Sequence, residues 1–149
     1  MIPTTKVMDI TVKRTIPVPA EKVFDAWMDP KSPGGPWFES SALIFAPAPP
    51  KAGSLYYFTI SWEGRTFALY GRFVEIQRPG KVAYTWVGEG TKGVESTVTV
   101  TFEARGKETE VILRHANLPD DEMGRQTEYG WAHILESVAE GLAKKSASA

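Results

Sequence analysis

Cysteine is absent from the 149-residue chain, which excludes disulfides, thiolate metal sites and thiol nucleophiles. The two histidines, His115 and His133, have neither the H-x-x-x-H spacing nor the nearby carboxylates of a zinc site, so no metal or other cofactor is expected. No apolar run approaches about 20 residues, which predicts no membrane insertion. The net charge of −1 lacks the basic excess of nucleic-acid-binding proteins. Because the N-terminus has no apolar leader, we expect a cytoplasmic protein.

The composition that remains is that of an average soluble globular protein, with 42% hydrophobic and 23% charged residues. This length suits one domain, which we expect to span residues 1–149 with an ordered core at about 7–145 and a frayed tail at 146–149. Aromatic residues are the enriched class, and five of them are tryptophans. The oligomeric state is open, and a homodimer is compatible with the sequence.

The first third of the chain predicts a strand followed by a short helix. Residues 7–16 alternate between apolar and polar side chains, which is typical of a half-buried strand. After Pro17-Val18-Pro19, residues 20–28 carry apolar side chains at helical spacing. The proline- and glycine-rich segment 31–36 leaves room for at most one more short turn of helix.

The middle of the chain predicts six further strands joined by short turns, which is typical of an antiparallel meander. We place them at 41–46, 55–62, 65–76, 82–87, 94–104 and 108–117. Pro119-Asp120-Asp121-Glu122 then opens a long helix, with Asp120 as its expected N-cap. The apolar stripe of this helix consists of Trp131, Leu135, Val138 and Leu142.

This order of elements predicts an α+β fold in which a curved antiparallel sheet of about seven strands wraps around a long C-terminal helix. One or two short helices follow the first strand. A single helix cannot cover both faces of such a sheet, so the sheet is expected to curve around it. Large side chains on a curved surface favour a hollow between sheet and helix, which would be the default binding site.

The chain resembles the helix-grip fold of the START and pollen-allergen superfamily, and more closely the family related to the C-terminal domain of the activator of Hsp90 ATPase. The resemblance covers about residues 7–142. The stretches that carry it are Arg14–Trp27, Trp37-Phe38, Gly71–Ile76, Val82–Trp86, Ser96–Phe102, His115–Asp120 and Gly130-Trp131. Two departures lie where the resemblance places the pocket mouth: Gly34-Gly35-Pro36 replaces a short basic helix, and Ser54 stands where a second glycine is common.

The resemblance implies a pocket protein, because members of the wider superfamily bind lipids or aromatic molecules or act as polyketide cyclases or hydrolases. Fold alone does not choose among these functions. The eukaryotic co-chaperone carries an additional N-terminal domain. Since only six residues precede the first strand here, we expect that domain to be absent and do not transfer the Hsp90 function.

The candidate ligand-binding residues are mainly aromatic and stand on strands or on the last helix. The alternative is that these side chains simply fill the core. The set is Arg14, Trp37, Phe58, Tyr84, Trp86, His115, Trp131 and Leu135.

Two polar members of this set have two readings each. His115 shares the strand parity of Val111 and Leu113, so it faces the interior either as a hydrogen-bonded core residue or as a polar pocket group and weak catalytic candidate. Arg14 lies on the inward parity of the first strand, where it would anchor a ligand carboxylate or form a salt bridge at the strand end. His133 lies off the apolar stripe and is expected at the surface.

No catalytic constellation is recognisable, since neither a G-x-S-x-G motif nor a serine triad is present. Residues 88–93 match G-x-G-x-x-G, but a strand pattern follows them where a dinucleotide site needs a helix, so they predict a hairpin loop. We therefore expect binding of a small apolar or aromatic molecule. The alternatives are a cyclase- or hydrolase-like enzyme and a chaperone-partner module, the latter unsupported by the chain length.

Overall fold

The computed structural model describes residues 7–28, 42–46, 51–62, 64–88 and 91–147. Its elements follow the order β1 Val7–Ile16, α1 Ala20–Met28, β2 Ala42–Ala46, β3 Leu55–Trp62, β4 Arg65–Gln77, β5 Lys81–Gly88, β6 Ser96–Arg105, β7 Glu108–Pro119 and α2 Glu122–Ala147. Every strand pairing is antiparallel, in the spatial order β1-β7-β6-β5-β4-β3-β2.

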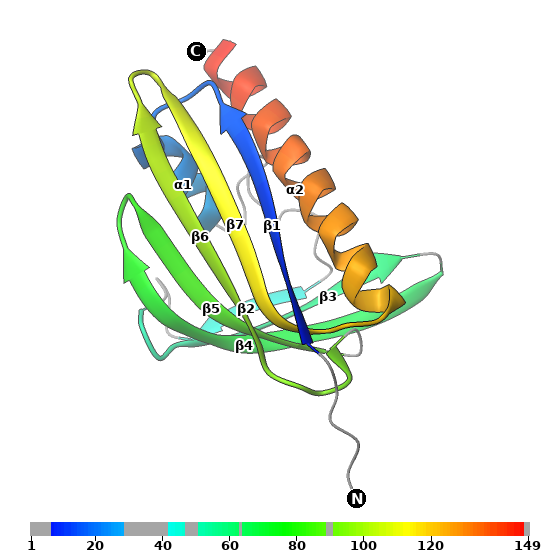
Figure 1. Ribbon diagram of the computed structural model, residues 1–149. Coiled ribbons are helices and arrows are strands. Elements are labelled where there is room, and N and C mark those ends of the chain that lie inside the picture. Colours follow the sequence, from blue (N-terminus) through cyan, green and yellow to red (C-terminus); the bar gives the residue numbers. More distant parts are fainter. Residues whose placement is uncertain (1–6, 29–41, 47–50, 63, 89–90, 148–149) are drawn as a thin grey trace, which may run out of the picture.

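The predicted α+β fold is confirmed, with a curved antiparallel sheet and a long C-terminal helix. The expected sheet of about seven strands is a body of six long strands, β1 and β3 to β7, with the five-residue β2 paired along β3 at the far edge. In Figure 1, β6, β7 and β1 run upright, β3 and β4 cross beneath them, and α2 lies alongside β1. One short helix, α1, follows β1, and the segment where a second was allowed lies outside the described residues.

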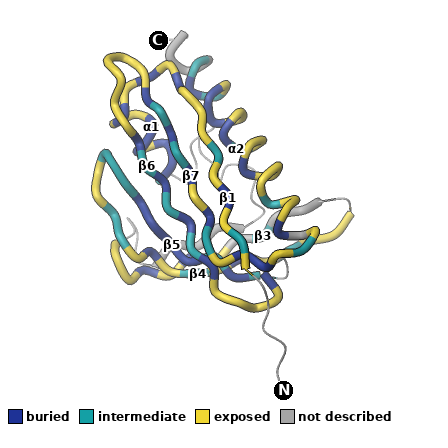
Figure 2. Tube along the Cα trace, viewed as in Figure 1, coloured by how far each residue is buried: buried dark blue, intermediate teal, exposed yellow. Residues whose placement is uncertain are grey.

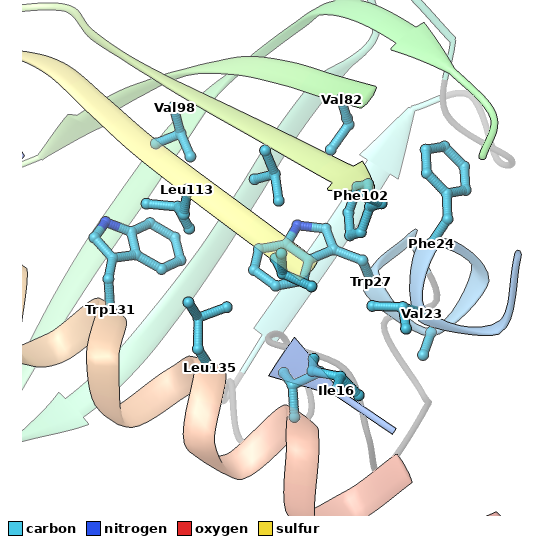
Figure 3. Packing of buried hydrophobic residues seen from close by; sticks show 14 of the residues in the cluster. Ile16, Val23, Phe24, Trp27, Val82, Val98, Phe102, Leu113, Trp131 and Leu135 are labelled. Atoms are coloured by element: carbon cyan, nitrogen blue, oxygen red, sulfur yellow. The ribbon is translucent and has the colours of Figure 1, made fainter. Parts of the chain in front are cut away.

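The core lies between the sheet, α1 and α2. Alternate side chains of β6 are buried, as the period of a strand with one buried face requires. The stripe of α2 behaves as predicted, because Trp131, Leu135, Val138 and Leu142 are all buried. Figure 2 shows the alternation of burial along β6. Figure 3 shows Trp131 and Leu135 pointing toward Leu113 of β7. Burying side chains of this size contributes roughly 1.5–3 kcal/mol each.

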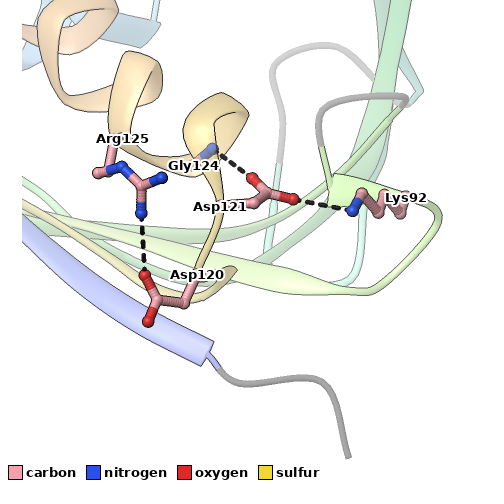
Figure 4. A network of polar contacts seen from close by, with 5 residues as sticks. All are labelled: Lys92, Asp120, Asp121, Gly124 and Arg125. Carbon is pink, nitrogen blue, oxygen red and sulfur yellow. Dashed lines mark hydrogen bonds and ion pairs between the residues drawn. The ribbon is translucent and has the colours of Figure 1, made fainter. Parts of the chain in front are cut away.

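The start of α2 corrects the predicted cap by one residue. The amide of Gly124 donates a hydrogen bond of 2.9 Å to Oδ1 of Asp121, so Asp121 is the N-cap. Asp120 instead pairs with Arg125 at 3.3 Å, and Lys92 lies 2.9 Å from the other oxygen of Asp121 (Figure 4). The backbone hydrogen bond from Gly124, together with Lys92, lowers the pKa of Asp121.

Two other boundaries also differ from expectation. Pro119, expected in the helix opening, ends β7, where it pairs with Val7 of β1. The helix continues to Ala147, two residues beyond the expected end of the ordered core at 145. Neither Ser146 nor Ala147 is a glycine or proline that would stop the helix there.

The sheet bends where three strands meet at a glycine. Tyr56 on β3 pairs with Gly71 on β4, and its hydroxyl donates a hydrogen bond across Gly71 to the carbonyl of Thr85 on β5. A Cβ at Gly71 would lie 2.2 Å from that carbonyl oxygen. The β4–β5 ladder is irregular two residues later, with a register shift between Phe73 and Glu75. The missing side chain at Gly71 therefore allows the close approach of β5 and the crossing of Tyr56.

Replacing Gly71 by alanine is expected to lower the free energy of unfolding by about 3 kcal/mol or more, because the new methyl group collides with backbone that cannot move away cheaply. Gly130 on α2 is the matched control, since nothing lies within 4 Å of a Cβ built there. Gly130→Ala is expected to raise stability by roughly 0.5–1 kcal/mol. Urea unfolding of both variants measures the difference, and equal stabilities would refute this account of the bend.

Candidate functional site

The candidate site is a cluster of aromatic rings contributed by the bent sheet and both helices. Trp86 of β5 lies 5.1 Å from Trp131 of α2 between ring centroids, and Trp27 of α1 stacks on Trp131 at 6.5 Å. The ring centroid of Tyr84 lies 6.5 Å from that of Trp86 and 5.7 Å from that of Tyr56, so Tyr84 extends the cluster toward β3. The rings form one continuous, largely buried cluster from α1 across α2 and β5 to β3, which we call the aromatic wall.

A buried chain of hydrogen bonds connects α2 to three strands at this wall. The indole nitrogen of Trp131 lies 2.9 Å from Nδ1 of His115 on β7. Nε2 of His115 lies 2.7 Å from Oγ of Ser96 on β6. The Ser96 hydroxyl donates its proton to the carbonyl of Trp86 on β5 at 2.7 Å. Both His115 and Ser96 have no exposed surface.

The donors and acceptors of this chain fit one arrangement of protons. An indole N–H only donates, so Nδ1 of His115 must be the unprotonated nitrogen. The ring proton is therefore on Nε2, which donates to Ser96. The Ser96 hydroxyl is free to accept, because its own proton points to the carbonyl of Trp86. Every polar atom in the chain is paired, and His115 is neutral.

Burial lowers the pKa of His115 to about 3, because the interior disfavours the charged imidazolium. A general base needs an available lone pair and a pKa near the working pH. The lone pair of His115 is held by Trp131, so this geometry disfavours the catalytic reading of His115 and favours the hydrogen-bonded one.

The two buried tyrosines of the wall are also uncharged. Burial raises the pKa of Tyr56, and Tyr84 raises it further. Burial likewise raises the pKa of Tyr84, and a hydrogen bond with the Trp27 side chain partly opposes this. The hydroxyl of Tyr56 is held by the Thr85 carbonyl.

Comparison with known proteins identifies the family. A family model described as "Activator of Hsp90 ATPase homolog 1-like protein" matches residues 17–143. The chain belongs to this family. This confirms the resemblance that the sequence motifs indicated.

Similar proteins match part of the chain in sequence and nearly all of it in fold. The "Activator of 90 kDa heat shock protein ATPase homolog" of Dictyostelium discoideum is 41% identical over 84 residues, covering 51% of this chain and 22% of that protein. PFC0360w, an HSP90 activator from Plasmodium falciparum, has a TM-score of 0.70 at 23% identity, covering 91% of this chain and 96% of that one. Ara h 8.0201 has a TM-score of 0.73 at 15% identity, covering 93% and 99%. Likeness at this level of identity shows the shared helix-grip fold.

Most of the predicted site residues that the structure describes meet at the aromatic wall. Trp86, His115 and Trp131 are in mutual contact, Tyr84 contacts Trp86, and Leu135 is buried one helical turn after Trp131. Trp37 lies outside the described residues, as does the side chain of Phe58 on β3. The structure does not bring Arg14 to the wall, because Arg14 is exposed on the edge strand β1. His133 is exposed, as expected.

Sequence reasoning did not assign four residues of the site. Trp27, Tyr56 and Phe73 lie on buried faces of their elements, and Ser96 starts the inward row that Val98 and Val100 continue. The row of inward positions on β6 was the available signal for Ser96, but a lone serine at a strand start carries no charge or size to mark it.

Three further features that the sequence analysis considered are a dinucleotide-binding loop, a membrane-spanning helix and a metal site. Gly88 ends β5, and β6 follows residues 91–95, so a strand rather than a helix follows the G-x-G-x-x-G match, as predicted; residues 89 and 90 lie outside the described residues. Within the described ranges, no helix is long and apolar enough to cross a bilayer. In the same ranges, no three His, Asp or Glu side chains gather as a metal site would need.

The low pKa of His115 predicts how stability depends on pH. The folded-state pKa of about 3 lies below the ordinary value of 6.5, so the unfolded chain binds a proton that the folded chain does not. This contribution to stability is complete above pH 6.5 and is lost as the pH falls toward 3. From pH 6 to pH 4, unfolding free energy is expected to drop by about 1.4 kcal/mol per pH unit more than in a His115→Gln variant.

Urea unfolding at pH 6, 5 and 4 measures this difference. The carboxylates with lowered pKa values, Asp9, Asp25 and Asp121, are common to both proteins and cancel in the comparison. His133→Gln removes the exposed histidine and is expected to follow the unsubstituted chain. Parallel pH dependences for the His115 variant and the unsubstituted chain would contradict a neutral, buried His115.

Proposed function

We propose that the chain binds a small, uncharged apolar or aromatic molecule between the bent sheet and α2, against the aromatic wall. The observation that carries this proposal is that the indole N–H of Trp131 and the hydroxyl of Tyr56 are both hydrogen bonded within the protein. Trp131, His115 and Ser96 form a closed chain ending on the Trp86 carbonyl, and Tyr56 is held by Thr85. The wall therefore offers ring faces and edges to a ligand.

Membership of a helix-grip family supports this function at the level of fold, because the long helix and the bent sheet enclose the region between them. A ligand that buries about 300 Å² of apolar surface would gain roughly 7 kcal/mol, and association costs about 4 kcal/mol or more. The difference of about 3 kcal/mol or less corresponds to a Kd of several millimolar or weaker from contacts with rings alone.

Charge on the ligand is expected to weaken binding. Among the described residues, the buried polar side chains are neutral at pH 7: Ser54, Thr85, Thr91, Ser96, Thr109 and His115. A carboxylate placed among them would lose its hydration without gaining an opposite charge, which costs several kcal/mol. No catalytic role is assigned to His115, because its lone pair is already used.

Two naphthalene probes test the proposed function at pH 7. 1-Naphthalenemethanol is neutral and 1-naphthoate is ionised, while the ring system is the same. The neutral probe is expected to bind about tenfold or more tightly, because only the anion must be desolvated without a partner. Isothermal titration calorimetry measures both affinities.

Substitutions on the two faces of the sheet locate the binding. Trp86→Leu on the wall is expected to weaken binding of the neutral probe by about tenfold, and Tyr70→Leu on the exposed outer side of β4 is the matched control with no expected effect. Absence of detectable binding by either probe up to its solubility limit would refute the function. Equal binding of both probes would refute the argument from charge.

A second candidate function is an interaction with an Hsp90-type chaperone, favoured by the family and by the names of two relatives. A surface for it lies on the outer side of β3 and β4, where Leu55, Tyr57, Tyr70 and Val74 are 63%, 40%, 51% and 51% exposed. Tyr57 and Tyr70 are direct cross-strand partners. Exposed apolar groups on adjacent strands, with tyrosines among them, are typical of protein-binding surfaces.

Stimulation of a purified Hsp90-type ATPase tests this candidate. The double variant Tyr70→Ser, Val74→Ser is expected to raise the protein concentration needed for half-maximal ATPase stimulation by about tenfold or more. Tyr129→Ser is the control, since Tyr129 is 78% exposed on α2 and distant in sequence from this surface. Lack of stimulation by the unsubstituted chain would exclude this function without affecting the ligand proposal.

A further inference from the structure

Ser96 links His115 to the backbone of β5 in the hydrogen-bond chain between α2 and the sheet. It faces Trp86 as its direct cross-strand partner on β5, and its hydroxyl reaches the carbonyl of that partner. On its other side it meets Nε2 of His115, whose own cross-strand partner is Val98, two residues along β6. Backbone pairing on both sides therefore fixes where the Ser96 oxygen lies.

The direction of the Ser96 hydroxyl selects the same tautomer of His115 that the indole N–H of Trp131 requires. Its one hydrogen is held by the Trp86 carbonyl, so the oxygen presents a lone pair to Nε2. His115 in turn must keep its proton on Nε2 and leave Nδ1 as an acceptor. In the other tautomer, and in the imidazolium, an N–H on Nδ1 would face the indole N–H of Trp131.

The position of the Trp131 ring depends on this acceptor. The indole contacts Trp27 at 6.5 Å and Trp86 at 5.1 Å between ring centroids, and its hydrogen bond to His115 is the polar contact that sets its rotation. Without that acceptor, a buried N–H would be unpaired or the ring would have to turn. Either change alters the surface that the aromatic wall presents.

We infer that Ser96 is the positioning residue of the site: its hydroxyl holds His115 in the Nε2–H tautomer, and that tautomer fixes the orientation of the Trp131 indole. The last step, that the fixed indole serves ligand recognition, rests on the proposed function. The first two steps concern the ligand-free chain and stand independently of it.

Nitrogen-15 NMR of the ligand-free chain tests the tautomer directly. His133→Gln provides a background in which His115 is the single histidine. In that background, Nδ1 is expected to show the shift of an unprotonated nitrogen and Nε2 that of a protonated one, unchanged from pH 8 to pH 5. A ring protonated on Nδ1, or one that titrates in this range, would overturn the inference even if no Ser96 variant folds.

Substitution of Ser96 tests its role in the same background. Ser96→Ala is expected to bring the two ring-nitrogen shifts of His115 closer together, to shift the Trp131 indole N–H signal and to make its hydrogen exchange about tenfold faster. Ser96→Thr keeps the hydroxyl and is expected to restore all three signals. Unchanged spectra in Ser96→Ala would overturn the inference.

Ser54→Ala is the matched control, since Ser54 is also buried and its hydroxyl oxygen accepts a hydrogen bond of 2.9 Å from the Lys51 amide. It is expected to lose comparable stability while the His115 and Trp131 signals stay in place. Shifts of equal size in this variant would mean that the signals report stability alone, which would overturn the positioning role.

The affinity for 1-naphthalenemethanol tests whether the fixed Trp131 indole serves ligand recognition. Its affinity is expected to fall about tenfold in Ser96→Ala and to recover in Ser96→Thr. Altered spectra with unchanged affinity would overturn the ligand step. If the unsubstituted chain binds no probe, the proposed function fails, while the NMR result still decides whether Ser96 sets the tautomer.

Discussion

The indole of Trp131 is sealed between helix and sheet, and its N–H has to meet an uncharged acceptor there. His115 supplies that acceptor from β7 at 2.9 Å, so the contact joins α2 to the strand that pairs with β1. Apolar packing along the α2 stripe brings the helix to the sheet but leaves its rotation and sliding loosely determined. Breaking a directed hydrogen bond in a low-dielectric interior costs considerable free energy. The bond therefore selects one position and rotation of α2 against the sheet.

The bend of the sheet depends on a different kind of constraint, which is the absence of a side chain. Gly71 leaves room for the Thr85 carbonyl, and Tyr56 reaches over the glycine to bond that carbonyl. The same bend brings β5 toward the helices, so Tyr84 and Trp86 face Trp27 and Trp131 rather than a second sheet. Sheet curvature and ring clustering are therefore two results of one local arrangement of backbone.

The apolar–polar periodicity of the sequence predicted the strands and helices because one face of each element is buried and the other faces solvent. The same alternation placed His115 inward, and the structure buries it completely. It failed for Arg14 because parity gives the face of a strand and not its depth, and β1 is at the sheet edge. The role of Ser96 could not be predicted, since it arises from contacts with β5 and β7 that only the folded sheet brings together. Asp120 was chosen as cap over Asp121 because propensity does not distinguish two adjacent aspartates.

Asp121 serves two partners with its two oxygens. One closes the first turn of α2 through Gly124, and the other holds Lys92 in the connection between β5 and β6. The first turn of the helix and this connection are consequently linked through a single carboxylate. Loss of its negative charge would remove the ion pair with Lys92 and weaken the hydrogen bond from Gly124, which a neutral oxygen can still accept. Acid would therefore loosen the β5–β6 connection before it opens the first turn of α2 (Figure 4).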